Sequence, residues 1–591
     1  MTNSTAFRVA GRTFAWVLGA VLIAAIAMTA WVGVRGLLAY THLSDVQAEA
    51  SSVRDDLTDP AAATTAIDEI SVDTRAAESL TSDPIWQLAE SLPWVGPQLE
   101  AVSTVAAAAN QVVNTSLTPL TEVASSFELD ALRAENGRID LALFEELQAP
   151  ATISAAGIAA ASASIDNIDT APLLAPVGDA VTQVADVLTE ATEATSALAR
   201  ATVLLPSMLG ADDARDYLVL FQNNAEWRSL GGIPGAMALI HTDDGEMSLA
   251  GQESSSDYPK YEESVLPLDD DVLAIYTDHP GKWIQNVTQV ADFSISGELA
   301  RQMWALEHNG DEVDGVIALD PVALSYLLEA TGPIELPTGD VLTSENAVQL
   351  LLNDVYLRYT VPAEQDAFFA LAAASVFEAL SDGSSDPVEL VAALTKAGSE
   401  NRLLMWSAVE SEQTLIAETT LAGGLPITDE VTTTFGAYVN DGTGSKMDYY
   451  LDTDVAVQWD SCTLDESGLA SGTATMTLTV TNNAPADAAS LPDYITGGGS
   501  FGVPAGIART VGYLYVPEHF ELMDAVSTNE KGFGGASHDG RRVLSFSTDL
   551  ASGESFTATV TARSTVPTGA ELLVRQTPTI GDAYSEADFC A

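Results

Sequence analysis

An uncharged stretch near the amino terminus constrains this chain more than any other feature. Residues Phe14 to Val34 form 21 consecutive positions without a charge, enough for a helix to cross roughly 30 Å of hydrocarbon. Arg8 and Arg12 precede the stretch and Arg35 follows it, a cation bias that favours a cytoplasmic amino terminus. The stretch is longer than a usual signal-peptide core and lacks a convincing small-residue cleavage site. We therefore predict an uncleaved transmembrane signal anchor at 14–34, in preference to a removed signal peptide.

This anchor fixes the expected location of everything else. Residues 1–13 would form a cytoplasmic tail, and the chain after about residue 36 would lie outside the cytoplasm as part of a single-pass plasma membrane protein. The membrane is then one expected partner. The chain contains 23 Lys plus Arg against 84 Asp plus Glu, a formal net charge of −61. Because binding to a phosphate backbone depends on clustered cations, this balance excludes a nucleic-acid partner, whereas the acidity itself fits solubility, adaptation to salt or an acidic function.

A chain of 591 residues is too long for one hydrophobic core, and its patterning divides it into parts. Residues 36–206 are rich in Ala, Ser, Thr and Val with helical periodicity, which predicts an α-helical stalk. An apolar stripe from Val177 to Leu198 predicts close helix packing there. A spacer is the expected role, with a bilayer sensor or a coiled-coil dimer as alternatives.

The remaining two parts differ in their periodicity. Residues 211–450 alternate strand and helix signals, including a strand at 217–221, a hairpin around Asp243-Asp244-Gly245 and a helix that begins after Asp320. This order predicts a layered α/β domain. Residues 451–591 carry Thr-rich runs of period two, which predict a β-sandwich of the immunoglobulin-like type with a role in spacing or adhesion.

The two cysteines fall near the two ends of the last part. Cys462 and Cys590 form an even pair without CxxC spacing, as expected for a disulfide that closes this region in an oxidising compartment. Two buried free thiols are the alternative.

Polar groups concentrate in one stretch that directly follows the strand at 217–221. Asn223 to Gly235 reads Asn-Asn-Ala-Glu-Trp-Arg-Ser-Leu-Gly-Gly-Ile-Pro-Gly. A guanidinium such as that of Arg228 can bind two oxygens of a phosphate or carboxylate, and amides at a Gly-Gly turn can add donors. A salt bridge from Arg228 to Glu226, and Asn side chains that only tie the loop backbone, are the structural alternatives.

Several segments resemble an uncharacterised family. They are Pro93-Trp-Val-Gly96, Asp216 to Gly232 with its Asn-Asn-x-Glu-x-Arg-x-x-Gly-Gly element, Asn286-Val-Thr288, Asp314 to Asp320 and Gly332 to Pro337. The chain is similar here to a domain-of-unknown-function family of the DUF4012 type, whose members are membrane-anchored proteins common in actinobacteria. The resemblance covers about residues 80–450.

A second resemblance concerns the order of elements from Asp314 to Phe369, which is similar to that of the LytR-CpsA-Psr family. Those enzymes transfer glycopolymers from polyprenyl-pyrophosphate carriers to the cell wall, with arginines on the pyrophosphate and carboxylates on a divalent metal. The resemblance implies phosphate-binding roles for Arg228 and Arg358, and Mg²⁺ as a cofactor. Further family arginines are absent around Gln365-Asp366, where Glu364 and Asp366 stand instead. Arg358 also lies in the last turn of a predicted helix, where any cation is favoured.

Together these features predict the ligand-binding residues but no catalytic residue. The predicted ligand set is Asn223, Asn224, Glu226, Arg228, Gly231, Gly232 and Arg358. Six scattered His residues have no zinc-site spacing, so no metal ligands are assigned. We expect an α/β domain that binds an anionic, polyprenyl-phosphate-linked glycopolymer and assists its attachment or assembly; an enzyme would be a LytR-CpsA-Psr-like phosphotransferase. The alternative is a non-catalytic envelope scaffold or adhesion protein that acts through the stalk and the β-sandwich.

Overall fold

The computed structural model describes residues 23, 26–46, 60–120, 138–383, 385–529, 531–581 and 587–590. The chain divides into two compact units, one formed by residues 1–132 and 140–207 and the other by 133–139 and 208–591.

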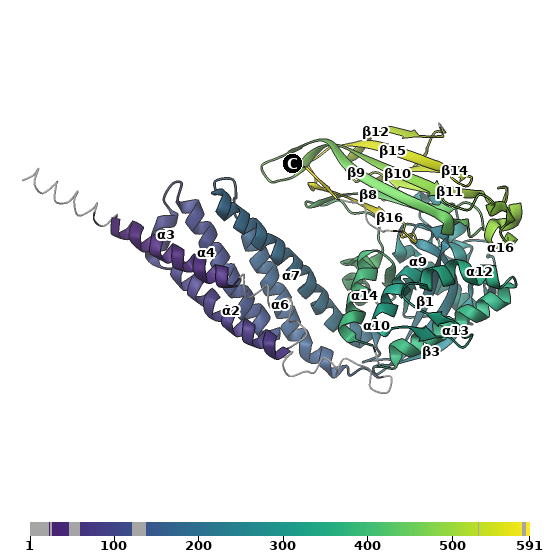
Figure 1. Ribbon diagram of the computed structural model, residues 1–591, viewed down its shortest axis with the longest axis horizontal. Helices are drawn as coiled ribbons and strands as arrows, with labels where there is room; N and C mark the ends of the chain where they lie inside the picture. The colour runs from purple at the N-terminus through teal and green to yellow at the C-terminus, as the bar shows by residue number, and fades with distance from the viewer. Residues whose placement is uncertain are drawn as a thin grey trace, which may run out of the picture. The chain divides into compact units, whose positions relative to one another are not determined.

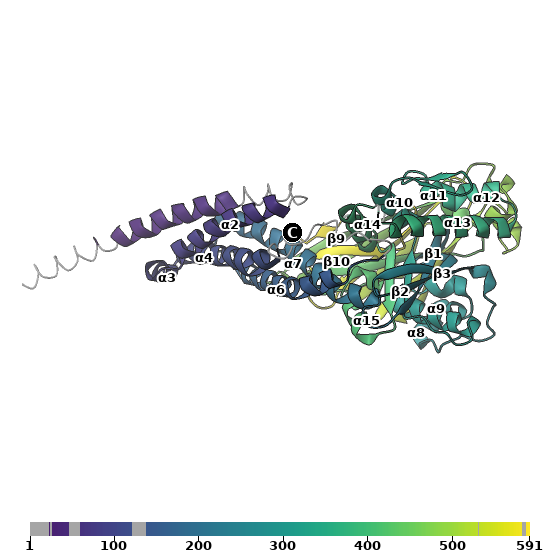
Figure 2. The same cartoon turned by 90° about the horizontal axis from the view of Figure 1, so that it is seen from below.

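The first unit is helical throughout its described part. A helix at 26–46 is followed by α2 (Pro60–Thr81), α3 (Pro84–Glu90), α4 (Gly96–Gln111), the π-helical η1 (Val112–Leu117), α6 (Ala142–Asp166) and α7 (Ala175–Met208). Figures 1 and 2 show the long helices lying side by side. The predicted stripe on α7 is confirmed from Val177 to Ala191, where Val181 and Leu188 are buried in a core shared with α4 and α6, whereas Leu198 at its predicted end is 37% exposed. That core includes Ala101, Ala108 and Ala161, small residues that let the helices approach closely.

The predicted fold class is wrong in its transmembrane helix. Among the residues that the structure describes, no helix is both long and apolar enough to cross a membrane. Most of the predicted anchor at 14–34, and all of the predicted tail at 1–13, lies outside the described residues. The part that is described belongs to the helix at 26–46, where Arg35 interrupts the apolar run after residue 34 and bonds to Asp83 at 2.7 Å. The described chain is instead a mixed helical and sheet protein.

The second unit begins with a five-stranded sheet in the order β3-β2-β1-β4-β7. Its strands are β1 (Arg215–Arg228), β2 (Gly231–Asp243), β3 (Glu246–Ser254), β4 (Gly315–Leu319) and β7 (Leu403–Ser407). Only the β1–β4 pairing is parallel, and the predicted hairpin at Asp243–Gly245 joins β2 to β3. On one face, α9 (Phe293–Glu307) packs through Leu299 and Met303 against Leu218 and Val316 of the sheet.

Helices α10 (Pro321–Thr331), α13 (Pro362–Ser381) and α14 (Pro387–Ser399) also contact this sheet. The predicted cap of α10 is confirmed, since the Asp320 carboxylate accepts the Ala323 N–H at 2.7 Å and Pro321 occupies the first turn.

Two further sheets form the sandwich. The six-stranded sheet has the order β13-β14-β11-β8-β16-β17 and the four-stranded sheet the order β12-β15-β10-β9. The strands are β8 (Thr432–Asp441), β9 (Leu451–Leu464), β10 (Ala470–Asn482), β11 (Ala508–Tyr515), β12 (Phe520–Ser527), β13 (Gly534–His538), β14 (Arg541–Leu550), β15 (Ser555–Ser564), β16 (Glu571–Gln576) and β17 (Asp588–Phe589). The predicted Cys462–Cys590 disulfide is confirmed.

The six-stranded sheet is covered on both faces. Leu544 and Phe546 on β14 pack with Leu478 of the four-stranded sheet, whereas Tyr515 and Val543 pack with α8 (Asp270–Tyr276). The Tyr276 and Tyr515 hydroxyls are hydrogen-bonded at 2.9 Å. Strand β8, which precedes residue 450, lies in this sheet and pairs in parallel with β16. The α/β layer and the sandwich therefore share one continuous interior within this unit.

Candidate functional site

The Asn223–Gly232 loop comprises the irregular end of β1, the turn at Ser229 and Leu230 and the start of β2, and it is an interior element of the second unit. The β1–β2 pairing shifts register between Asn223 and Trp227, which places residues 224–226 outside the ladder. Asn223, Asn224, Glu226 and Arg228 are all buried. The partners of their side chains therefore decide what the loop can do.

The side chains of the two asparagines form hydrogen bonds with other groups of the protein and do not face an open ligand site. Asn223 accepts the Ala225 N–H at 3.0 Å and donates to the Tyr356 hydroxyl at 2.7 Å. Asn224 donates to Asp320 and to the Pro578 carbonyl, both at 2.9 Å. The loop is thus joined to helix α12 (Val355–Arg358), to the amino terminus of α10 and to the segment after β16.

Arg402, which the sequence analysis missed, is central to this network. Its guanidinium donates to Asp320 at 2.8 Å, to Glu400 at 2.7 Å and to the carbonyls of Thr579 and Gly581 at 2.7 and 2.9 Å. The side chain is 1% exposed. The sequence signal for the importance of Arg402 was that cations are rare in this chain and that this one directly precedes a strand. The contacts assign Arg402 a structural role.

Glu226 forms a buried ion pair with Lys446. The ammonium also lies over the rings of Tyr356 and Tyr494, 4.6 and 4.8 Å from their centroids. Burial alone would lower the pKa of Lys446, but the Glu226 carboxylate raises it above its usual value. The lysine is therefore charged, and its charge is balanced inside the protein.

Arg228 points to other partners than Glu226. Its Nε and Nη2 donate to the side-chain Oδ1 of Asn286 at 3.1 and 2.9 Å, and its Nη1 donates to the backbone carbonyl of Trp227 at 2.7 Å. Asp441 and Asp448 interact with it electrostatically. Burial raises the pKa of Asp441 to about 6, although the positive charge of Arg228 opposes the shift.

Asp448 lies in the same interior region and is even more strongly affected. Burial, reinforced by the nearby Asp441 carboxylate, raises its pKa well above the usual range. One Asp448 oxygen accepts the Trp227 N–H at 2.8 Å, while the other is buried without a hydrogen bond, as is Oδ2 of Asp441. Arg228 therefore lies near two buried carboxyl groups that can be protonated, and not at an open anion-binding surface.

The paired glycines allow close backbone contact inside the protein. Gly231 has a φ of 126°, which side chains rarely adopt. A Cβ on Gly232 would lie 2.1 Å from the Asn223 carbonyl oxygen. The turn is therefore packed against the loop itself.

Arg358 is engaged elsewhere. Its guanidinium donates to both carboxylate oxygens of Asp340 at 2.8 Å, and its side chain is 42% exposed. It shares none of these hydrogen-bond partners with Arg228. The structure joins the loop to Tyr356, two residues before Arg358, instead.

The implied Mg²⁺ finds no set of ligands in the described chain. Over those residues, no group of three or more His, Cys, Asp or Glu side chains is arranged to hold a metal ion. The carboxylates of Glu226, Asp320 and Glu400 are committed to Lys446 and Arg402. No chemical step is therefore assigned to a metal here.

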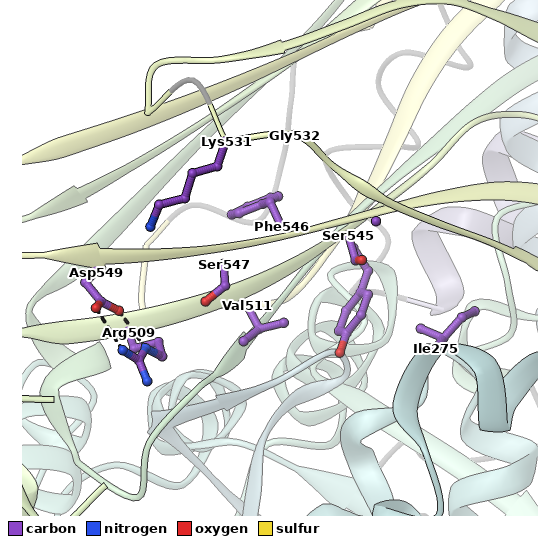
Figure 3. Close-up of a pocket in the computed structure, with 11 residues that line it drawn as sticks. Ile275, Arg509, Val511, Lys531, Gly532, Ser545, Phe546, Ser547 and Asp549 are labelled. Atoms are coloured by element: carbon purple, nitrogen blue, oxygen red, sulfur yellow. Dashed lines mark hydrogen bonds and ion pairs between the residues drawn. The ribbon is translucent and has the colours of Figure 1, made fainter. Parts of the chain in front are cut away.

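A solvent-open groove lies in the C-terminal part of the same unit (Figure 3). It has a volume of about 510 Å³ and lies between α8 and the strands β11, β13 and β14. Its polar lining comes from Arg509, Lys531, Ser545, Ser547 and Asp549. Arg509 and Asp549 form a double hydrogen bond at 2.6 and 2.8 Å, and the exposed Lys531 lies across the groove.

Comparison with known proteins adds one match. No curated protein matches the chain. The family described as "Protein of unknown function (DUF4012)" matches residues 212–356. This stretch runs from β1 to α12 and includes the entire Asn223–Gly232 loop.

Proposed function

We propose that this chain is a non-catalytic extracytoplasmic binding protein that holds an acidic glycan in the groove of its C-terminal sandwich. The observation that carries the proposal is the contrast between two sets of cations. Arg228, Arg402 and Lys446 are buried and bonded to the protein. Lys531 and Arg509, by contrast, line an open groove, in which Arg509 is paired with Asp549 and Lys531 is exposed.

The groove lining suits a ligand that combines hydroxyl groups with negative charge. An exposed ammonium binds a carboxylate, sulfate or phosphate as a point charge. The hydroxyls of Ser545 and Ser547 can donate and accept, and Asp549 can accept from a sugar hydroxyl. Because Arg509 is paired with Asp549, the exposed Lys531 gives the groove lining its net positive charge, in a chain with 23 Lys plus Arg against 84 acidic residues.

The proposed ligand is still an anionic glycan, as the sequence predicts, but its proposed binding site is the sandwich groove and not the α/β layer. Polyprenyl-phosphate recognition by the α/β layer rested on Arg228 and Arg358 acting together, and these arginines have separate protein partners. The LytR-CpsA-Psr resemblance and the actinobacterial origin remain hypotheses about the ancestry of that layer. The disulfide supports the extracytoplasmic placement, since such bonds persist in oxidising compartments.

The test is calorimetric titration of the full-length chain with a polyuronate oligosaccharide, a neutral oligosaccharide of equal length and a soluble polyprenyl pyrophosphate. We expect binding of the polyuronate only, weakened about fivefold or more in Lys531→Ala. Lys260→Ala is the matched control, because Lys260 lies over the Trp283 ring, outside the groove. Equal polyuronate affinity in wild type and Lys531→Ala would overturn the proposal. So would polyprenyl pyrophosphate binding that Arg228→Ala abolishes in a folded protein.

A further inference from the structure

The turn between α3 and α4 exposes a tryptophan in an unfavourable backbone conformation. Trp94 has a φ of 77° and is 87% exposed. A bulky residue in this region costs about 1–3 kcal/mol and persists only where the surroundings impose it. A glycine or asparagine would adopt the same conformation at lower cost. The exposed indole is therefore retained at a cost in stability, and the fold itself does not use it.

The turn holds this conformation firmly. Gly96 N–H donates to the Leu92 carbonyl at 2.8 Å, and Leu92 N–H donates to the Ala89 carbonyl at 3.0 Å. A Cβ on Gly96 would lie 2.0 Å from the Glu90 carbonyl oxygen, so the chain turns sharply at this point. Eight residues before Trp94, Trp86 is buried and donates to the Leu99 carbonyl at 3.3 Å. One tryptophan thus anchors the helix pair while the other projects from its end.

Trp94 is part of a larger apolar surface. Leu88, Leu92 and Val95 on the same turn are also exposed. Across this end of the unit lies the start of the helix at 26–46, which runs antiparallel to α2 because Arg35 bonds to Asp83 and His42 bonds to Asp73. Trp31 of this helix donates to Asp83, the residue that caps the start of α3, at 3.4 Å, and Ile26, Trp31 and Val34 are exposed. Residues 14–25, which precede this helix in the chain, contain no charge.

We infer that the Trp94 turn, comprising Leu88, Leu92, Trp94 and Val95, docks into the interfacial layer of an uncharged, zwitterionic lipid bilayer. Tryptophan is enriched at such interfaces because its ring is apolar and its N–H stays hydrated. The exposed apolar residues of the helix at 26–46, together with the absence of charge in the sequence of residues 14–25, favour lipid over a protein partner. The contact needs no membrane-spanning helix, since apolar side chains at a turn enter only the headgroup boundary.

The charges around the turn select the lipid. Asp83 is paired with Arg35, and Glu90 accepts from the Ser103 hydroxyl at 2.6 Å. Glu100 and the net charge of −61 add negative potential. Anionic vesicles are thus expected to bind less well than zwitterionic ones, a preference opposite to that of a basic amphipathic helix.

The test uses the full-length chain with phosphatidylcholine vesicles that contain brominated lipid, which quenches nearby tryptophan fluorescence. Trp94→Phe keeps an apolar ring and removes the fluorophore, so we expect the quenched fraction to fall, whereas Trp283→Phe in the second unit should leave it unchanged. Trp94→Asn should weaken vesicle binding about tenfold and raise the unfolding temperature, because asparagine tolerates the backbone conformation. This pairing separates lost docking from lost folding.

Two results would overturn the inference. The first is equal bromolipid quenching in wild type and Trp94→Phe, which would show that residues 14–34 alone hold the chain on vesicles. The second is a lipid-free oligomer that Trp94→Asn dissociates, which would make a second copy the occupant of this surface. Neither outcome depends on the sandwich groove.

Discussion

The guanidinium of Arg402 lies 2.8 Å from the carboxylate of Asp320 at a site where both side chains are at most 1% exposed. Removing one partner of such a pair leaves a buried charge uncompensated, at a cost of about 3–5 kcal/mol. We therefore expect Arg402→Met to lower the free energy of unfolding by roughly this amount in chemical denaturation. The Arg301–Glu312 pair, whose side chains are 31% and 55% exposed, is the less buried control, and Arg301→Met should change stability by about 1 kcal/mol or less. Equal effects of the two substitutions would contradict a structural role for Arg402.

Gly232→Ala tests whether the glycine pair serves packing. The added Cβ would meet the Asn223 carbonyl oxygen at 2.1 Å, so backbone must move in a buried loop. We expect a loss of about 2–4 kcal/mol in the free energy of unfolding. Gly424→Ala is the control, since a Cβ there meets nothing within 4 Å and should be nearly neutral. A stable Gly232→Ala protein with altered ligand binding would instead restore the loop as a ligand site.

Asp441 predicts a pH dependence of stability. Its pKa is raised from 3.8 to about 6 by burial, so the folded state binds its proton more tightly than the unfolded state does. Stability from this group is fully present below pH 4 and is lost as the pH rises through about 6, a change of about 3 kcal/mol. The pKa of Asp448 is shifted in the same direction by burial and adds to this loss of stability.

Asp441→Asn removes this titration while keeping an oxygen to accept from Thr443. Relative to wild type, the variant should gain unfolding free energy progressively between pH 4 and pH 7, measured by denaturant titration at each pH. Taking the difference between the two proteins removes the general effect of the net charge. A constant difference across this range would show that Asp441 titrates normally.

The Cys462–Cys590 bridge closes a sequence separation of 128 residues. In the chain-entropy description, loss of so long a loop constraint destabilises a protein by about 4–5 kcal/mol. Cys462→Ser, Cys590→Ser and the double variant should therefore lose the same stability, because each breaks one bridge. Alkylation of the unfolded wild type should add mass only after reduction. Alkylation without reductant would mean two free thiols.

Local signals in the sequence predicted several features of the fold correctly. Asp320 and Pro321 begin α10, the turn at Asp243–Gly245 joins β2 and β3, and the cysteine pair is bonded. The helix cap and the turn depend on residues a few positions apart in the sequence. Each cysteine has only one other cysteine with which it can pair. Such features need no knowledge of how distant segments pack.

The environment of the Asn223–Gly232 loop depends on segments far away in the chain. Asp448 bonds to Trp227 and Asn440 bonds to Ser229, so the sandwich covers a loop whose composition resembles an open site. Burial on this scale is set by tertiary packing, and residue spacing around Arg228 carries no signal for it. The strand β8 escaped the predicted domain division for the same reason, because its parallel partner β16 begins at residue 571. Arg402 was missed because its carbonyl partners are at residues 579 and 581.

These carbonyl partners also impose an order on synthesis. A nascent chain that has emerged as far as β15 already contains Arg402, Asp320 and β8, yet it lacks β16 and the carbonyls of Thr579 and Gly581. Until those residues leave the ribosome, a central cation is incompletely solvated and a strand edge in the middle of the six-stranded sheet is open. We therefore expect the second unit to complete its folding only after residue 581 has emerged, and a chain truncated before residue 579 to stay incompletely folded.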